Sequence, residues 1–197
     1  MYTVIGSLRS RTLRVLWLLE ELGVAYEHLP ASPGSDQVRA HYSTGKVPVL
    51  LEGEHVFTDS VAIMTYLSDK HEQFTFKAGT PERAIQDGHT NFLVDEFDGI
   101  LWTAARHSFV LPEEHRVPAV KDSLKWEFER SQKRLVERLG SNPFLMGEVM
   151  TIADILAVHC GGWAITAKFP VTEPVFRDYI ERLRARPAFV RAMDRDG

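Results

Sequence analysis

The chain has 197 residues, of which 44% are hydrophobic and 25% charged, and its formal net charge is −4 at pH 7. These values are ordinary for a globular protein with one large domain or two small ones. A slightly acidic balance attracts neither nucleic acid nor an anionic membrane surface, so we expect neither as a partner.

Cysteine content and the lengths of the apolar runs bear on the compartment. Cys160 is the one cysteine in the chain, which excludes an intrachain disulfide and favours a reducing compartment. The N-terminus lacks a basic region followed by an apolar run of signal length. No stretch approaches the roughly 20 apolar residues that span a bilayer. We therefore expect a cytoplasmic protein.

The first third of the chain alternates short strands with helices. Apolar or alternating stretches predict strands at residues 2–5, 25–29, 47–52 and 55–58. Between and after them lie a helix closed by Gly23, a weak short helix over residues 35–42 and an amphipathic helix over residues 59–71. The element order is therefore β-α-β-α-β-β-α. The first two strands are joined through a helix and should be parallel, whereas the last two should form a hairpin.

The rest of the chain indicates helices only. The stretch "EQFTFKAGTP" has no periodicity, and we expect a linker at residues 75–81. Helices are predicted from residue 81 to about 109, over about 118–139, from 151, near 174 and after 187. The predicted fold class is an α/β domain, residues 1–74, followed by an all-helical domain, residues 82–197.

Several polar groups favour a purely structural interpretation. Thr151 and Asp154 have the spacing of a capping box at the start of a helix. Three sets of charged residues are interpreted as solvated helix faces: the arginines of "ERLRARPAFVRAMDR", the pair Glu20 and Glu21, and the cluster Asp95, Glu96 and Asp98.

The join between the first strand and the first helix carries two serines, Ser7 and Ser10. Free N–H groups at a helix start favour an anion, and a serine hydroxyl there could donate to a thiolate. Lowering the pKa of a thiol by two units from about 8.5 takes about 2.7 kcal/mol. One charge-assisted hydrogen bond plus the helix dipole could supply that amount. The alternative is that Ser10 simply caps the helix.

Val47 and Pro48 precede the third strand. A cis bond between them would leave the Val47 backbone free to pair with a peptide ligand, as an added strand does. The alternative is a trans proline that opens an edge strand. Lys46, just before them, could meet a carboxylate or be an ordinary solvated lysine.

Asp59 and Ser60 begin the helix that follows the hairpin. The free N–H groups and the Ser60 hydroxyl would suit a carboxylate, and Asp59 could hold an ammonium group. The alternative is N-capping by either residue.

The sequence shows no spacing typical of a metal site. The eight histidines show no paired spacing typical of metal ligands, so we expect no metal. Cys160 lies within an apolar helical stretch and is interpreted as packed rather than reactive.

Taken together, these stretches resemble the cytosolic glutathione transferase family. The resemblance is carried by "GSLRSRTLRVLWLLEELGVAYE", "GKVPVLLEGEHVFTDSVAIMTYLSDKH", "FLMGEVMTIADILA" and "RPAFVRAM". It covers nearly the whole chain, in order and at family spacing. It implies a thioredoxin-like N-terminal domain, a helical C-terminal domain, glutathione as co-substrate and a homodimer in which the third helix of one protomer packs against the partner's first long C-terminal helix.

The resemblance also implies roles for individual residues. The serine of the serine-using classes maps to Ser10, with Ser7 as runner-up, and Arg9 or Arg11 could also face the sulfur. Val47, before Pro48, maps to the residue that pairs with the cysteinyl backbone of glutathione. Asp59 and Ser60 map to the acid–serine pair that holds the γ-glutamyl group. Lys46 maps to a position that can contact the glycine carboxylate. Strand one ends in neither a tyrosine nor a cysteine, so the classes that use those residues fit poorly, and Asp59 replaces the family's usual glutamate.

The implied function is a bacterial-like, serine-type glutathione transferase of detoxification, which stabilises the glutathione thiolate for attack on a small electrophile. The second-substrate pocket would lie between Ser10 and the first long helix of the C-terminal domain, with the candidates Trp102, Arg106, His107 and Phe109. Two further functions stay open: a non-catalytic glutathione-fold binding or regulatory protein, and a glutathione-dependent peroxidase, isomerase or dehalogenase.

Overall fold

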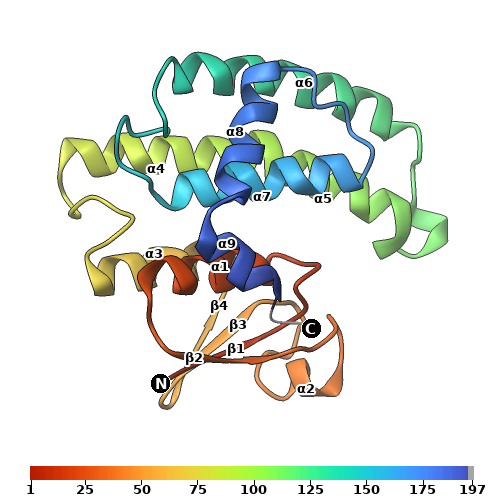
Figure 1. The fold of residues 1–197 in the computed structure, drawn as a ribbon. Helices are drawn as coiled ribbons and strands as arrows, with labels where there is room; N and C mark the ends of the chain where they lie inside the picture. Colours follow the sequence, from red (N-terminus) through yellow and green to blue (C-terminus); the bar gives the residue numbers. More distant parts are fainter. Residues whose placement is uncertain (195–197) are drawn as a thin grey trace. The chain divides into compact units, whose positions relative to one another are not determined.

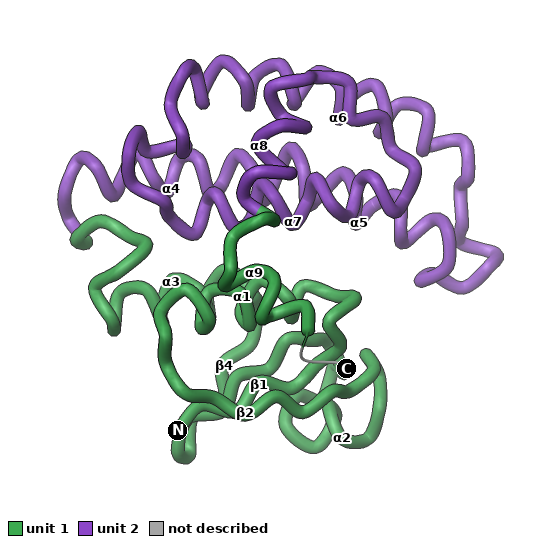
Figure 2. The backbone as a smooth tube through the Cα atoms, in the orientation of Figure 1, with its two compact units in different colours: residues 1–78, 184–197 green, residues 79–183 purple. Residues whose placement is uncertain are grey.

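The computed structural model describes residues 1–194 of the chain. They form two compact units, which Figure 2 shows in green and purple. The first unit contains residues 1–78 and residues 184–194, and the second contains Gly79–Leu183.

A four-stranded sheet forms the centre of the first unit (Figure 1). Its strands are β1 (Tyr2–Ile5), β2 (Tyr26–Leu29), β3 (Val49–Glu52) and β4 (His55–Thr58), in the order β2-β1-β3-β4. The β1–β2 pair is parallel and the β1–β3 and β3–β4 pairs are antiparallel. The predicted order of strands and helices, the parallel first pair and the hairpin are therefore confirmed.

The helices of this unit cover both faces of the sheet. α1 (Thr12–Leu22) and α3 (Ser60–His71) pack against each other on one face, and the short α2 (Asp36–Arg39) lies on the other (Figure 1). Alternation along the strands divides the apolar residues between the two faces. Ile5 and Val49 pack with Val38 of α2. Their even-numbered neighbours, such as Val4 and Leu50, are completely buried and point to the opposite face.

The C-terminal helix α9 (Pro187–Met193) packs onto α1. Arg186 forms a bidentate ion pair with Glu21, with N–O distances of 2.6 and 2.7 Å. Arg191 donates to Glu20 at 2.7 Å, and only 9% of Glu20 is exposed. The expectation of solvated charges is therefore wrong for Glu20 and Glu21, whose side chains are 9% and 6% exposed. Among the arginines, Arg182, Arg184 and Arg191 are exposed as expected and Arg186 is half-buried. Each stretch has a charged face, and the two faces neutralise one another.

The second unit is helical, as expected. One uninterrupted helical run comprises α4 (Pro81–Leu93), the π-helix η1 (Val94–Gly99), α5 (Ile100–Ala105) and the π-helix η2 (Arg106–Val110). The short 3-10 helix η3 (Glu113–His115) leads to α6 (Val120–Leu139), α7 (Ile152–Thr166) and α8 (Pro174–Arg184). No helix within residues 1–194 is long and apolar enough to cross a membrane.

Aromatic side chains fill the core of this unit. The Phe97 ring lies 5.1 to 5.8 Å, centre to centre, from the rings of Phe92, Phe128 and Phe176 in edge-to-face arrangements. Phe97 belongs to η1, so the same π-helical turn that carries the acidic cluster also enters the core.

The acidic cluster on η1 is only partly solvated. Asp95 is exposed, but Asp98 is 8% exposed and Glu96 pairs with Arg134 at 2.6 Å. Burial by itself would raise the pKa of Glu96, but hydrogen bonds from Ser131 and Arg134 hold it below its ordinary value. The interpretation of all three acids as a solvated face is wrong for Asp98 and Glu96. The interpretation assumed an α-helix, whereas these acids lie on the π-helix η1. A π-helical turn is wider and shifts side chains around the helix axis relative to an α-helix.

The Thr151–Asp154 capping box is confirmed. Asp154 also accepts hydrogen bonds from the Leu145 N–H at 2.8 Å and from the Tyr179 hydroxyl. Burial raises the pKa of Asp154, and the donated bonds counteract this. The Asp154 carboxylate thus ties the start of α7 to the preceding loop and to α8.

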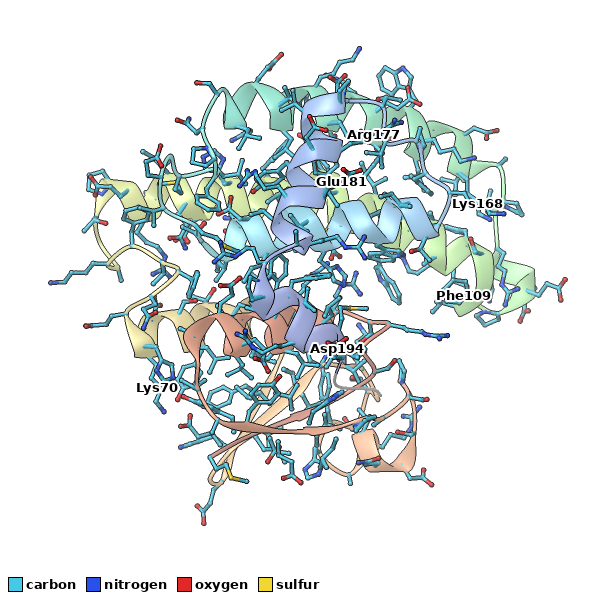
Figure 3. The ribbon with its side chains drawn as sticks, in the orientation of Figure 1. Lys70, Phe109, Lys168, Arg177, Glu181 and Asp194 are labelled. Atoms are coloured by element: carbon cyan, nitrogen blue, oxygen red, sulfur yellow. The ribbon has the colours of Figure 1, made fainter. Side chains whose placement is uncertain are left out.

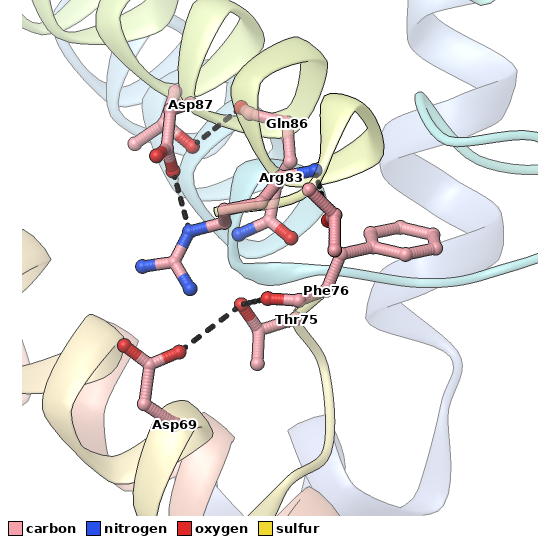
Figure 4. A network of polar contacts seen from close by, with 8 residues as sticks. Asp69, Thr75, Phe76, Arg83, Gln86 and Asp87 are labelled. Carbon is pink, nitrogen blue, oxygen red and sulfur yellow. Dashed lines mark hydrogen bonds and ion pairs between the residues drawn. The ribbon is translucent and has the colours of Figure 1, made fainter. Parts of the chain in front are cut away.

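The boundary between the two units, at residues 78 and 79, falls inside the predicted linker. Local polar contacts order each side of it (Figure 4): Arg83 pairs with Asp87 at 2.9 Å in the second unit, and the Thr75 hydroxyl contacts Asp69 in the first. At the other end, residues 184–194 group with the first unit rather than with the helices before them, because α9 docks on α1. The assignment of domains 1–74 and 82–197 stays a prediction.

Candidate functional site

The sheet register brings three loops to one edge of the first unit. Ile5, the last residue of β1, pairs with Val49, the first of β3, and Val49 pairs with Thr58, the last of β4. The segments just beyond these positions therefore emerge at the same edge. They contain the predicted site residues of this unit: Ser7, Ser10, Lys46, Val47, Pro48, Asp59 and Ser60.

Gly6 is the point of closest approach at this edge. A Cβ atom on Gly6 would lie 2.1 Å from Thr12 Oγ1 and 3.0 Å from the Val47 Cβ. Gly6 also has a φ of 146°, which L side chains rarely adopt. The strand end, the start of α1 and the loop before Pro48 thus meet with no room for a side chain.

The Ser10 hydroxyl is held within the turn that leads into α1. It donates to the Ser7 carbonyl oxygen at 2.6 Å, accepts from the Thr12 N–H at 3.1 Å and contacts Thr12 Oγ1 at 2.9 Å. A hydroxyl has one hydrogen and two lone pairs. If its hydrogen goes to Ser7, both lone pairs are occupied by Thr12, and the Ser10 hydroxyl has no hydrogen left for a ligand. α1 itself begins at Thr12 with Arg11 as its N-cap, so Ser10 precedes the cap.

The Ser7 hydroxyl makes fewer contacts. It accepts from the Arg9 N–H at 3.2 Å, and within residues 1–194 no acceptor receives its hydrogen. Ser7 is half-buried, and it follows Gly6 at the crowded strand end. Its hydroxyl hydrogen is therefore available to a ligand atom at this edge.

The loop before β3 presents Lys46 and Val47. The Val47–Pro48 peptide bond is cis, so the cis form predicted as one of two possibilities is the one present. Pro48 is buried, Val47 half-buried and Lys46 exposed. Arg39 orders the loop by donating to the Gly34 and Ser43 carbonyl oxygens at 3.0 and 2.9 Å.

Asp59 caps α3 while keeping one oxygen for another partner. Its Oδ1 accepts from the N–H groups of Val61 and Ala62 at 2.9 and 3.1 Å, and its φ of 70° is unusual for a residue with a side chain. Ser60 is 2% exposed and accepts a hydrogen bond from Arg14 Nη1 at 3.2 Å. The predicted capping role is therefore present at Asp59.

Sequence reasoning missed three residues around this edge. Arg14 is 1% exposed and Thr12 completely buried, and His28 Nε2 lies 2.8 Å from the Gly6 carbonyl oxygen. A signal for Arg14 was present: it stands on the apolar face of "TLRVLWLL", where an arginine is buried only with a specific partner.

The second-substrate candidates lie in the second unit, along the end of the long helical run. Trp102 belongs to α5, and Arg106, His107 and Phe109 belong to the π-helix η2. Arg106 donates to Thr103 Oγ1 at 2.8 Å, and His107 Nδ1 accepts from the Val117 N–H at 3.0 Å. Phe109 is 70% exposed at the end of the run (Figure 3).

These features define a class of protein: a thioredoxin-like domain with a polar site at one sheet edge, followed by a helical region. Residues 5–75 match the family model described as "Glutathione S-transferase, N-terminal domain". Among curated relatives, glutathione S-transferase theta-2 of Rattus norvegicus is 29% identical over 123 residues, which cover 58% of this chain and 49% of the relative. The human theta-2B protein is 28% identical over 129 residues, which cover 59% and 50%.

Solved structures show the same fold over the whole chain. The theta class glutathione S-transferase of Xanthomonas axonopodis pv. citri is 26% identical with a TM-score of 0.77, covering 97% of this chain and 96% of that one. A glutathione transferase of Methylococcus capsulatus is 24% identical with a TM-score of 0.87, covering 100% and 99%. The first part of the chain is therefore similar to the N-terminal domain of glutathione S-transferases, and its fold is that of the solved glutathione transferases. The chain spans about half the length of the curated theta relatives that it matches.

Proposed function

We propose that this protein is a glutathione transferase that binds glutathione, favours the thiolate form of its cysteine and lets the thiolate attack a small electrophile. The sheet register carries this proposal, because it gathers the loops of Ser7, Val47 and Asp59 at one edge. Its support includes the curated relatives, which are named glutathione S-transferases, and the Xanthomonas protein, which was solved with glutathione bound.

A serine hydroxyl is the proposed hydrogen-bond donor to the glutathione sulfur. The sequence offers Ser10 as the first candidate and Ser7 as the second. The contacts of Ser10 favour Ser7, because Ser10 would have to break a 2.6 Å bond to the Ser7 carbonyl oxygen before it could donate elsewhere. Neither hydroxyl is a base at neutral pH, so the serine stabilises the thiolate and leaves its proton to solvent.

The remaining contacts follow the peptide chemistry of glutathione. The Val47 backbone would pair with the cysteinyl residue as an added strand does. The free carboxylate oxygen of Asp59 would accept from the γ-glutamyl ammonium, Ser60 would donate to the neighbouring carboxylate, and exposed Lys46 would meet the glycine carboxylate.

The electrophile is proposed to bind near Trp102, Arg106, His107 and Phe109. Apolar and aromatic groups there would contact an apolar substrate, with Arg106 and His107 as the polar groups. Conjugation forms a carbon–sulfur bond and releases a leaving group. For a chlorinated dinitrobenzene the carbon–chlorine bond breaks and chloride leaves.

We also propose a cytoplasmic homodimer with a role in detoxification. This proposal rests on the resemblance to the glutathione transferases. Val56 of β4 and Ile85 of α4, 47% and 56% exposed, are single apolar side chains of a kind that any protein surface carries. The proposed interface packs α3 of one protomer against α4 of its partner, and a monomer by light scattering at micromolar concentration would contradict it.

Steady-state conjugation of glutathione to 1-chloro-2,4-dinitrobenzene tests the proposed activity. We expect Ser7→Ala to lower kcat/KM by about 10- to 100-fold, the value of one charge-assisted hydrogen bond. Ser123→Ala, at an exposed serine of α6, is the matched control and should not change it. A binding module would hold glutathione without turnover. Turnover only with a peroxide, an isomerisation substrate or a dehalogenation substrate would instead identify a glutathione-dependent peroxidase, isomerase or dehalogenase.

A further inference from the structure

Arg14 is a charged residue inside the apolar core of the first unit. It lies in the first turn of α1, its side chain is 1% exposed, and its Nη1 donates to Ser60 Oγ at 3.2 Å. Ser60 is the first residue of α3 and is 2% exposed. Arginine is almost never fully buried without specific partners, and the Ser60 hydroxyl is one of the groups that Arg14 contacts.

The contact sets the direction of the Ser60 hydroxyl. A guanidinium has donors only, so Ser60 Oγ must accept in this bond and keeps its own hydrogen for another acceptor. Within residues 1–194 no group receives that hydrogen. A buried donor without an acceptor is costly, which indicates that an acceptor arrives from outside the chain.

The neighbouring Asp59 offers the opposite chemistry. One oxygen of its carboxylate caps α3 through Val61 and Ala62, and the other is open at an exposed position. Two adjacent residues thus present a donor backed by a buried positive charge and an acceptor that carries a negative charge. A ligand with a carboxylate and an ammonium on one carbon matches this pair.

We propose that Arg14 is a positioning residue of the glutathione site. By donating to Ser60, it fixes that hydroxyl as a donor and places a positive charge behind it, so that the site selects the α-carboxylate of the γ-glutamyl residue. This inference rests on the proposed function, and it assigns the selectivity for the carboxylate to a residue that does not touch the ligand.

Calorimetry with two ligands tests the proposal. The first ligand is glutathione, and the second is its analogue in which hydrogen replaces the γ-glutamyl α-carboxylate. Wild type should bind glutathione about 10- to 100-fold more tightly than the analogue, as expected for a charge-assisted contact. In Arg14→Met this ratio should fall to within about threefold, and adding Ser60→Ala should lower it little further.

Arg83→Met is the matched control, because Arg83 is also largely buried but pairs with Asp87 in the second unit. Its ratio should equal that of wild type. The inference is overturned if Arg14→Met weakens both ligands equally, or if wild type binds both alike. If wild type binds neither ligand, the proposed function itself fails and the inference fails with it.

A measurement on wild type covers the case in which Arg14→Met does not fold. In protein labelled with ¹⁵N-arginine, the Arg14 guanidinium resonance should shift on addition of glutathione and stay in place with the analogue. Equal shifts with both ligands, or none with either while glutathione binds, would overturn the proposal.

Discussion

The ion pair between Arg186 and Glu21 should stabilise the first unit strongly. The Glu21 side chain is 6% exposed, and it accepts two bonds from Arg186 and one from Trp17 Nε1 at 2.9 Å. Arg186→Met leaves this carboxylate buried with one donor. Breaking a buried pair costs about 3–5 kcal/mol. Because 34% of the Arg186 side chain is exposed, water can replace part of the lost contact, and we expect about 2–3 kcal/mol.

Urea unfolding followed by circular dichroism measures this loss. In a thermal scan of a chain of this size, about 2–3 kcal/mol corresponds to a fall in Tm of roughly 4–12 °C. Arg191→Met is a graded comparison, because 55% of that side chain is exposed, and it should cost no more than about 1 kcal/mol.

A double-mutant cycle separates the ion pair from simple loss of packing. Glu21→Gln removes the buried charge, so the double variant with Arg186→Met should lose less than the sum of the two single variants, by about 1–2 kcal/mol. Additive losses, or an Arg186→Met variant within about 0.5 kcal/mol of wild type, would refute the reasoning.

Three further changes should affect the first and second units differently. In Asp154→Ala, the buried N–H groups that donate to the Asp154 carboxylate lose their acceptor. The free energy of unfolding, measured in urea, should fall by about 3–5 kcal/mol, against about 1–2 kcal/mol for Tyr179→Phe; equal losses would contradict this. Gly6→Ala puts a methyl carbon 2.1 Å from a side-chain oxygen and should abolish glutathione binding by calorimetry, whereas Gly53→Ala, also at positive φ but with nothing within 4 Å, should leave it intact. Burial and the positive charge of a nearby arginine lower the pKa of His89. The unfolded chain therefore takes up a proton before the folded one does, and stability should fall as the pH drops below about 6.5, by at most about 1.4 kcal/mol per pH unit; a slope unchanged in His89→Gln would contradict this.

Local patterns in the sequence were sufficient for the fold. The apolar run "VPVLLE" followed by "HVFT", the left-handed Gly23 after "LLEEL" and the Thr151–Asp154 spacing each depend on neighbours within a few residues. Each predicted element is present, although β3 begins at Val49 rather than at Val47. The gathering of Ser7, Val47 and Asp59 at one edge followed from strand order and register.

Contacts between distant residues were not accessible from local patterns. Glu21 and Arg186 are far apart in the chain, and each alone looks like a surface charge on its helix. The direction of the Ser10 hydroxyl depends on the turn geometry between Ser7 and Thr12, which residue types do not specify. The pairing of Arg14 with Ser60 likewise depends on how α1 packs against α3.

The most direct test of the proposed function is the pKa of the glutathione thiol when bound. The ultraviolet absorption of the thiolate would be followed between about pH 5 and 9 in wild type, Ser7→Ala and Ser10→Ala. We expect wild type to give a value well below the ordinary value of about 8.5, and the loss of the donating serine to raise it. Because the Ser10 hydroxyl is already bonded to Ser7 and Thr12, the larger rise should occur in Ser7→Ala. A bound thiol that still titrates near its ordinary value in wild type would contradict thiolate activation and leave a protein that only binds glutathione.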